Sequence, residues 1–314
     1  MIIEKIAKQE NAFKRNLRFY SSARNAFKAF LHELIPGADQ SVLLPAYIGW
    51  SPQEGSGVFD PVLESKVPYD FYRMDRNLHI DLDDLRSKLK LANVKLLVLI
   101  HYFGYRDPAY EQAVALAHEH GVVVLEDQAH SFFNDMVYGS TGRLGDASIF
   151  SLHKMLPLPD GGILALPWET PWNAGFERSN AAPSDCFMYD LPSIAKRRRR
   201  NAEEIAEKLQ PFHEEITPLR PQMQFGEVPQ TFPVIINHVS RDGLYEIMNQ
   251  AGYGVVSLYH KMIDQLSCEL FPDSHRLSRR IMNLPVHQDM AFDQIAPMVE
   301  TLLHSTDRLK FQKS

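Results

Sequence analysis

Two adjacent carboxylates stand at the end of a short apolar segment. Residues 124–131 read Val-Leu-Glu-Asp-Gln-Ala-His-Ser, so we expect a buried strand that ends at Glu126 and Asp127. The carboxyl ends of parallel strands are the usual place for ligands in α/β sheets. A carboxylate there can keep a ring nitrogen protonated, because a low-dielectric site favours the charged pair. The alternative is a polar strand end that turns into solvent.

A lysine follows the next apolar segment, Ala147 to Ser151. This residue, Lys154, is the only lysine between Lys95 and Lys196. Partial desolvation after a buried strand favours the neutral amine, which can attack a carbonyl carbon. The alternative is a surface-loop lysine with no chemical role.

Small residues precede the first amphipathic segment. Asn25 to Leu34 carries apolar residues at helical spacing, and Ser22 and Ala23 come just before it. The free N–H groups at the start of a helix form the positive end of its dipole and suit a phosphate. The alternative is that Ser22 only caps the helix.

The elements that must position these residues alternate along the first half of the chain. We expect strands over 41–44, 94–102, 122–126, 147–151 and 163–166, and helices over 25–34, 81–91 and 108–119. Apolar strands joined by helices favour an α/β fold with a mostly parallel sheet covered by helices.

The pattern changes after about residue 185. The expected elements are a long polar helix over 194–209, a strand over 231–237, a helix over 242–251 and a last helix after Asp293. We therefore expect a large domain over residues 1–190 and a smaller C-terminal α/β domain over 191–314. The proline-rich stretch 167–192 is the expected boundary.

Composition excludes several classes of protein. Of the 314 residues, 45% are hydrophobic and 23% are charged, so the chain has the apolar surface that a disordered chain lacks. Its net charge of −6 creates no positive field, so neither nucleic acid nor an acidic membrane surface is an expected partner. The basic run 196–200 is predicted to be a solvated helix face, with Arg199 and Arg200 paired to Glu203 and Glu204.

The sequence also carries signals about location and metals. Only two cysteines occur, Cys186 and Cys268, which suggests a reducing compartment. No signal peptide is visible in residues 1–10, and no apolar run is long enough for a membrane helix. We expect a cytoplasmic protein. No residues stand at metal-ligand spacing, so no metal site is predicted.

Taken in order, these segments resemble the pyridoxal-phosphate-dependent sugar aminotransferases of the DegT/DnrJ/StrS type, a branch of the aspartate aminotransferase fold. The matching segments are Ser21–Ala26, Leu43–Tyr47, Leu99–Gly104, Leu125–Ser131, Gly145–Ser151 with Lys154 and Gly161-Gly162, and Leu284–His287. The resemblance implies a large domain that binds pyridoxal 5′-phosphate and a smaller C-terminal domain.

The resemblance also implies roles for individual residues. Lys154 corresponds to the lysine that forms a Schiff base with the cofactor's aldehyde. Asp127 corresponds to the carboxylate that pairs with the pyridine nitrogen, so that the ring can withdraw electrons. His130 is expected near the cofactor's phenolic oxygen.

The phosphate and the ring face have counterparts too. Ser151 and the Ser22–Ala23 turn are expected to hold the phosphate. The family places an aromatic residue after the Pro-Ala segment that stacks on the ring, and Trp50 is the candidate. Gly49 is the alternative occupant of that position.

Two departures from the family pattern stand out. Ser151 and Lys154 are three residues apart, whereas the family spaces them by five, which implies a two-residue deletion. The chain is also shorter than typical members, mostly between Leu166 and Ile194. In relatives, that region helps shape the substrate pocket and the dimer contact.

The resemblance implies an aminotransferase that acts on a small keto compound, a nucleotide-linked keto-sugar in particular, with glutamate as amino donor. One alternative is a sugar dehydratase, because some relatives carry histidine at the lysine position and His153 stands beside Lys154. Another is a non-catalytic, cofactor-binding regulatory protein.

The resemblance further implies a homodimer with the site at the subunit interface. The stretch 47–59 is rich in aromatic residues, which a partner subunit could help to bury. The alternative is that these residues pack inside the single chain.

Overall fold

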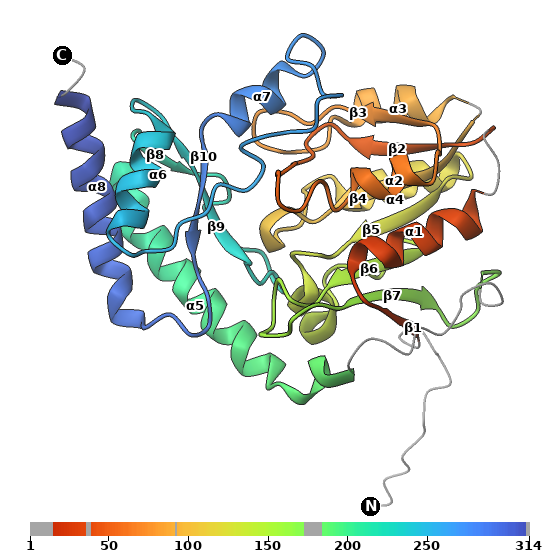
Figure 1. The fold of residues 1–314 in the computed structure, drawn as a ribbon, viewed down its shortest axis with the longest axis horizontal. Helices are drawn as coiled ribbons and strands as arrows, with labels where there is room; N and C mark the ends of the chain where they lie inside the picture. Colours follow the sequence, from red (N-terminus) through yellow and green to blue (C-terminus); the bar gives the residue numbers. More distant parts are fainter. Residues whose placement is uncertain (1–14, 36–38, 92, 173–183, 312–314) are drawn as a thin grey trace, which may run out of the picture.

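The computed structural model describes residues 15–35, 39–91, 93–172 and 184–311. Residues 1–10, in which no signal peptide is visible, lie outside these residues. Part of the predicted proline-rich boundary, 167–192, lies outside them as well. Within the described chain, the strands form one seven-stranded and one three-stranded sheet. Figure 1 shows the large sheet with its helices on one side of the molecule and the small sheet on the other.

The large sheet is mostly parallel, as predicted. Its strands are β1 (Arg15–Tyr20), β2 (Ser41–Pro45), β3 (Tyr69–Tyr72), β4 (Val94–Ile100), β5 (Val123–Asp127), β6 (Ala147–Ser151) and β7 (Gly162–Pro167), in the order β1-β7-β6-β5-β4-β2-β3. Only β7 runs against its neighbours, β6 and β1. The central strands β4 and β5 are buried nearly throughout, because helices cover both faces of the sheet.

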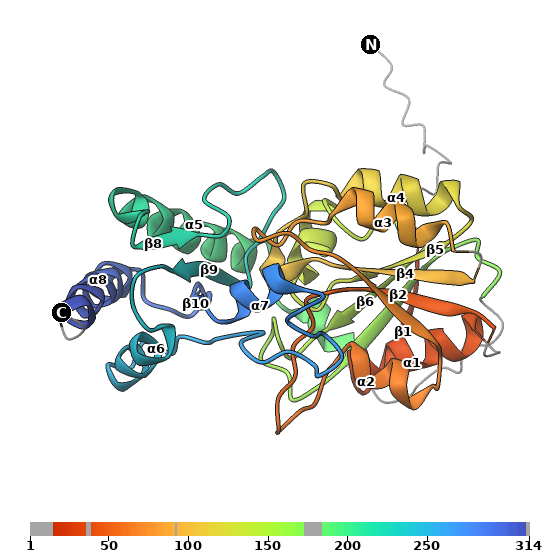
Figure 2. The same cartoon turned by 90° about the horizontal axis from the view of Figure 1, so that it is seen from above.

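The covering helices lie in two layers. They are α1 (Ala23–Leu34), α2 (Phe59–Glu64), α3 (Leu82–Leu89) and α4 (Tyr110–Glu119). Figure 2 shows α1 and α2 on one face of the sheet and α3 and α4 on the other. The buried residues of α1 recur at helical spacing, at positions 26, 27, 30, 31 and 34, and pack on the sheet. Short helical turns occur at Tyr102–Gly104 and Asn134–Tyr138.

The C-terminal part has its own core around the small antiparallel sheet. Its elements are α5 (Leu191–Leu209), β8 (Ile216–Pro218), β9 (Thr231–Ile236), α6 (Arg241–Gln250), α7 (Pro272–Ser278), β10 (Ile281–Pro285) and α8 (Ile295–Phe311), with short turns at Ser184–Met188, Gln210–Phe212 and Phe292–Gln294. Helices α5, α6 and α8 pack around this sheet. The division of the chain into 1–190 and 191–314 stays a prediction.

One residue of the basic run in α5 contradicts the prediction of a solvated face. Arg198 is only 1% exposed. Its guanidinium donates to Gln288 Oε1 at 2.8 Å and to the Gln230 carbonyl at 3.1 Å, and it lies over the Phe133 ring. The prediction fails because α5 packs between the turn at Asn134–Tyr138 and the small sheet, so its inward face is buried even where it is charged.

The predicted ion pairs of this helix are half right. Arg199 does pair with Glu203, at 3.7 Å. Arg200 does not pair with Glu204, since its guanidinium lies over the Phe292 ring, 4.2 Å from the centroid. Glu204 is paired with a lysine one turn later.

The aromatic stretch 47–59 packs inside the single chain. Tyr47 and Phe59 are fully buried in the large core, and Trp50 packs against it from a partly exposed position. This agrees with the second of the two alternatives, so these rings give no support for burial by a partner. Among the described residues, no helix has both the length and the apolar character needed to cross a bilayer.

Candidate active site

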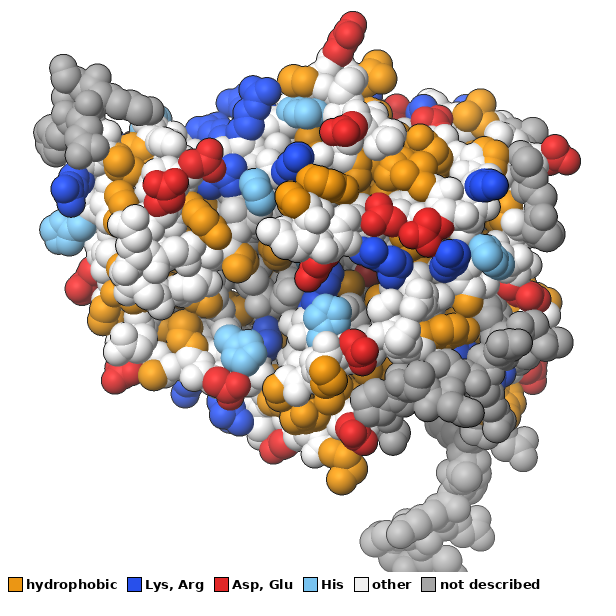
Figure 3. Space-filling view, viewed as in Figure 1, with side chains coloured by type: hydrophobic (Ala, Val, Ile, Leu, Met, Phe, Trp, Pro, Cys, Tyr) orange, Lys and Arg blue, Asp and Glu red, His pale blue; other side chains and the backbone are white. Residues whose placement is uncertain are grey.

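The predicted site residues meet around one pocket. A cavity of about 690 Å³ lies at the carboxyl ends of β4, β5 and β6 and beside the start of α1. Its wall contains all seven of them: Ser22, Ala23, Trp50, Asp127, His130, Ser151 and Lys154. Figure 3 shows histidine, acidic and basic side chains together around the hollow between the two lobes of the molecule. The sheet topology therefore gathers the residues, while their individual roles stay predictions.

Asp127 is a buried carboxylate at the edge of the pocket. It is the last residue of β5 and is 5% exposed. Its Oδ1 accepts the Ala129 N–H at 2.8 Å, and within the described residues its Oδ2 accepts no hydrogen bond. Burial raises the pKa of Asp127, although this N–H and the charge of Lys154 act in the opposite direction. A cationic group in the pocket would offset the effect of burial on this pKa, because it favours the ionised carboxylate.

Glu126 points to the other side of the sheet. Its carboxylate lies 2.8 Å from His101 Nε2 and accepts the Tyr110 hydroxyl at 2.8 Å and the Gly142 and Gly145 N–H groups at 2.6 and 2.7 Å. Burial raises the pKa of Glu126, but these hydrogen bonds outweigh it and the net pKa is lowered. Sequence reasoning treated Glu126 and Asp127 together, whereas the strand period of two places them on opposite faces.

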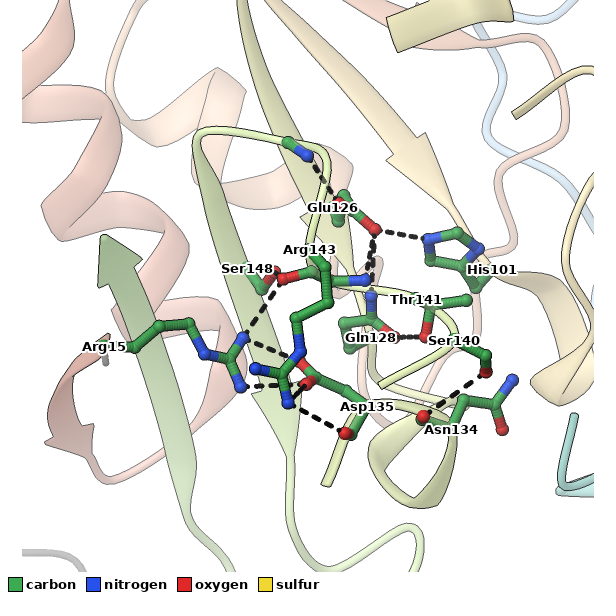
Figure 4. Close-up of polar contacts among 12 residues, drawn as sticks. Arg15, His101, Glu126, Gln128, Asn134, Asp135, Ser140, Thr141, Arg143 and Ser148 are labelled. Atoms are coloured by element: carbon green, nitrogen blue, oxygen red, sulfur yellow. Dashed lines mark hydrogen bonds and ion pairs between the residues drawn. The ribbon is translucent and has the colours of Figure 1, made fainter. Parts of the chain in front are cut away.

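The carboxylate of Asp135 supports the loop that follows β5. Figure 4 shows Asp135 between Arg15 of β1 and Arg143, and the ion pairs measure 2.7 and 2.8 Å. In the same network, Thr141 donates to Gln128 Oε1 at 2.9 Å. These buried contacts tie the loop after Asp127 to the edge of the sheet, which fixes the pocket wall from behind.

His130 lies inside the pocket wall as a neutral imidazole. Its Nδ1 accepts the Phe103 N–H at 3.2 Å, and the two rings stack with centroids 6.0 Å apart. Burial, reinforced by the charge of Lys154, lowers the pKa of His130 well below its ordinary value. Because Nδ1 is the acceptor, the proton of the neutral ring sits on Nε2. That N–H can donate to an oxygen of a bound molecule.

Lys154 corrects one expectation. Its side chain is exposed, so the desolvation expected from the sequence is absent in this structure. The turn after β6 is held by the Met155 and Leu156 N–H groups, which both donate to the Leu152 carbonyl. Leu152 and Met155 are buried, and His153 and Lys154, which stand between them in the chain, lie at the rim of the pocket.

The start of α1 forms another wall. Ser22 Oγ accepts the Asn25 N–H at 3.2 Å, so Ser22 caps the helix, and the same residue lines the pocket. A Cβ on Gly162 would lie 2.2 Å from the Ser22 backbone, so only glycine lets β7 approach this turn. Gly162 in turn pairs with Ser151 of β6, which brings Ser151 beside the first turn of the helix. The N–H of Ala23 belongs to that turn, where helical N–H groups lack internal partners.

One wall was missed by the sequence reasoning. Residues 257–260 of the C-terminal part also line the pocket, and Tyr259 packs among the rings behind it. These residues lie in a loop with no helical or strand period, so the sequence carries no signal that would have found them.

A comparison with family sequence models identifies the family of the chain. The model of the DegT/DnrJ/EryC1/StrS aminotransferase family matches residues 67–169 and 179–303. The chain belongs to this family. The resemblance seen in the sequence is therefore confirmed.

Individual proteins are similar to this chain over different lengths. A curated relative, the spore coat polysaccharide biosynthesis protein SpsC of Bacillus subtilis (strain 168), is 31% identical over 117 residues. That match covers 36% of this chain but only 30% of SpsC, so the chain spans less than a third of that relative.

Solved structures share the fold over nearly the whole chain. The aminotransferase TlmJ from Streptoalloteichus hindustanus has a TM-score of 0.75 at 20% identity, covering 93% of this chain and 86% of that one. The E. coli GDP-4-keto-6-deoxy-D-mannose-3-dehydratase with bound hydrated PLP has a TM-score of 0.73 at 17% identity, covering 93% and 89%.

The residues present fit pyridoxal phosphate. Asp127 offers a buried carboxylate oxygen without a partner among the described residues, as a protonated ring nitrogen requires. The first turn of α1 offers N–H groups for a phosphate, and Lys154 offers an amine at the rim of the same pocket. When bound, the cofactor supplies an aldehyde that carries amino groups and a ring that withdraws electrons.

Proposed function

We propose that this aminotransferase moves the amino group of an amino acid such as glutamate to the carbonyl carbon of a nucleotide-linked keto-sugar. The observation that carries this proposal is that Lys154, Asp127, His130 and the start of α1 line one pocket. Its volume of about 690 Å³ falls in the range of pockets that hold small organic ligands. The names of the similar proteins support the sugar class, since they mention polysaccharide synthesis and a GDP-linked keto-sugar.

Three side chains take part in the chemistry. Lys154 would hold the cofactor through its aldehyde group, and its amine would move the proton at the α-carbon of the amino donor. Asp127 holds the proton on the pyridine nitrogen. His130 donates its Nε2 proton to the phenolic oxygen, a role that its neutral state permits.

Other predicted residues hold the phosphate of the cofactor. The N–H groups of the Ser22–Ala23 turn and the hydroxyl of Ser151 bind the phosphate. Trp50 lines the mouth of the pocket, where Lys261 Nζ lies 4.2 Å from its ring centroid.

The function is tested with purified protein loaded with pyridoxal phosphate. Glutamate should convert the bound cofactor to its amino form, which is seen as loss of the visible absorption band. A set of nucleotide-linked keto-sugars should then restore the band and yield an amino sugar by mass spectrometry. Wild-type protein that binds the cofactor but gives neither conversion would overturn the transaminase assignment and favour the non-catalytic alternative.

A dehydratase is the second candidate, because His153 lies beside Lys154 at the rim of the pocket. Burial, followed by the charge of Lys154, lowers the pKa of His153, which favours a neutral base. This candidate predicts a product that has lost water rather than gained an amine. It also predicts that His153→Ala abolishes turnover while Lys154→Ala does not.

Assembly and location complete the proposal. We propose a homodimer, since two-fold dimers are the commonest closed assemblies of soluble enzymes. We also propose a cytoplasmic location, because Cys186 and Cys268 are both free thiols, as a reducing compartment favours.

A further inference from the structure

The loop after β2 is joined to a segment far away in sequence. The Trp50 N–H donates to the Lys261 carbonyl at 3.0 Å, and the Ile263 N–H donates to the Ile48 carbonyl at 3.1 Å. Gly49 and Met262 form the bridge between these two bonds. The C-terminal part thus reaches into the wall of the cofactor pocket.

Gly49 leaves a space that an aromatic ring fills. A Cβ built on Gly49 would lie 2.9 Å from Cδ1 of Tyr259 and 3.4 Å from its Cα, which is too close for the ring to stay where it is. The φ of Gly49 is outside the left-handed region, so its backbone does not require glycine. The residue is glycine because of the space that Tyr259 takes.

Tyr259 is held in an uncommon backbone conformation. Its φ of 61° is in the left-handed region, which bulky residues rarely adopt. The ring is fixed by other rings, with centroid distances of 5.2 Å to Tyr47, 5.4 Å to Tyr102, 5.8 Å to Phe103 and 6.1 Å to His130. Such a backbone persists only where the surroundings hold it, and it marks positions with a function.

The same ring borders the pocket next to its buried carboxylate. Tyr259 and Asp127 line the same cavity. Burial, and then the charge of Asp127, raise the pKa of the Tyr259 hydroxyl, so this side chain is neutral and close to that carboxylate. Trp50, the residue considered for ring stacking from the sequence, instead has its ring covered by Lys261.

We propose that Tyr259 provides the aromatic surface beside the cofactor's ring, and that Gly49 is glycine to admit it. The position that the family fills with an aromatic residue from the loop after β2 is filled here from the C-terminal part of the chain. This inference rests on the proposed site around Asp127 and Lys154. It makes cofactor affinity depend on the junction between the two parts of the protein.

The test measures pyridoxal phosphate affinity by absorbance titration of the purified full-length chain. Tyr259→Phe should bind within about twofold of wild type, and Tyr259→Ala should bind about tenfold more weakly, the scale of one aromatic contact. Gly49→Ala should weaken binding similarly, because its methyl group displaces the ring. In the Tyr259→Ala background, Gly49→Ala should have no further effect, and Gly49→Phe should restore part of the affinity.

The outcomes separate this inference from the proposed function. If wild-type protein does not take up the cofactor, both fall together. If it does, and Tyr259→Ala binds as tightly as wild type while Trp50→Ala does not, the inference alone is overturned. Thermal melts of the cofactor-free variants check folding. If Tyr259→Ala does not fold, the cofactor affinity of Gly49→Ala is compared with that of Tyr259→Phe instead. An unchanged affinity in Gly49→Ala then counts against the inference.

Discussion

Glu126 and Asp127 are neighbours in β5, yet their carboxylates serve opposite faces of the large sheet. Glu126 is fixed by His101, Tyr110 and two backbone N–H groups, and its pKa is lowered. Asp127 borders the pocket with a single N–H partner, and burial raises its pKa. One residue therefore anchors the strand while the next is left available to a cation.

Replacement of Asp127 by asparagine should keep the bound cofactor but reduce kcat by about 10²–10³-fold. This is the scale of one lost electrostatic contact in an active site. Asparagine keeps the shape of the side chain and removes the charge that holds the pyridine proton. Steady-state kinetics with parallel measurement of cofactor content checks this, and full turnover in Asp127→Asn would refute the pairing.

Borohydride reduction followed by peptide mapping should place the pyridoxyl group on Lys154. Lys154→Ala should take up no reducible cofactor and lose on the order of 10²–10⁴-fold in kcat, the contribution of a lost acid–base group. Lys261→Ala is the matched control, since Lys261 lies on the Trp50 ring near the same pocket. A label on any lysine other than Lys154 contradicts the assignment.

Glu126→Gln should lower the free energy of unfolding by about 1–3 kcal/mol at neutral pH, because one acceptor oxygen becomes an NH2 group that faces buried donors. The folded-state pKa of Glu126 lies below its ordinary value of 4.5. Its stabilising contribution is therefore complete above about pH 4.5 and disappears as the pH falls through the folded-state pKa.

Urea denaturation of wild type and Glu126→Gln across this pH range checks the prediction. The difference between the two proteins should shrink below pH 4.5. Glu269→Gln, at an exposed position, should follow wild type throughout. A difference that stays constant down to low pH would show that the charge of Glu126 contributes nothing.

Arg198→Ala should destabilise the protein by about 2–3 kcal/mol, because it removes charged hydrogen bonds and the packing on Phe133. The neighbouring Arg197 is exposed, so Arg197→Ala should stay within about 0.5 kcal/mol of wild type. Chemical denaturation of the pair checks this. Equal stabilities would mean that burial of Arg198 contributes nothing to folding.

Light scattering of the cofactor-loaded protein should give twice the chain mass of 36.0 kDa. The expectation rests on the frequency of two-fold symmetry, since Tyr47 and Phe59 are buried within the single chain. A monomeric mass at micromolar concentration would exclude a homodimer under those conditions.

The sequence by itself determined the central strands of the large sheet and several of its helices, whereas it did not predict β1, β3, α2, β8, α7 or β10. Apolar runs identified β4, β5 and β6, and helical spacing identified α1 and α3, because burial of one face is a local property of the pattern. The motifs around Asp127 and Lys154 stand at the ends of these strands. Parallel pairing then brings such ends to one edge of the sheet, so their meeting could be predicted.

Only the tertiary structure decided the rest. The burial of Arg198 depends on what packs against α5, and the exposure of Lys154 depends on which of its neighbours the core takes. Tyr259 reaches the pocket through contacts with Gly49, some 210 residues earlier in the chain. No local pattern predicts such a contact, because the need for glycine at position 49 depends on a side chain that lies far away in the sequence.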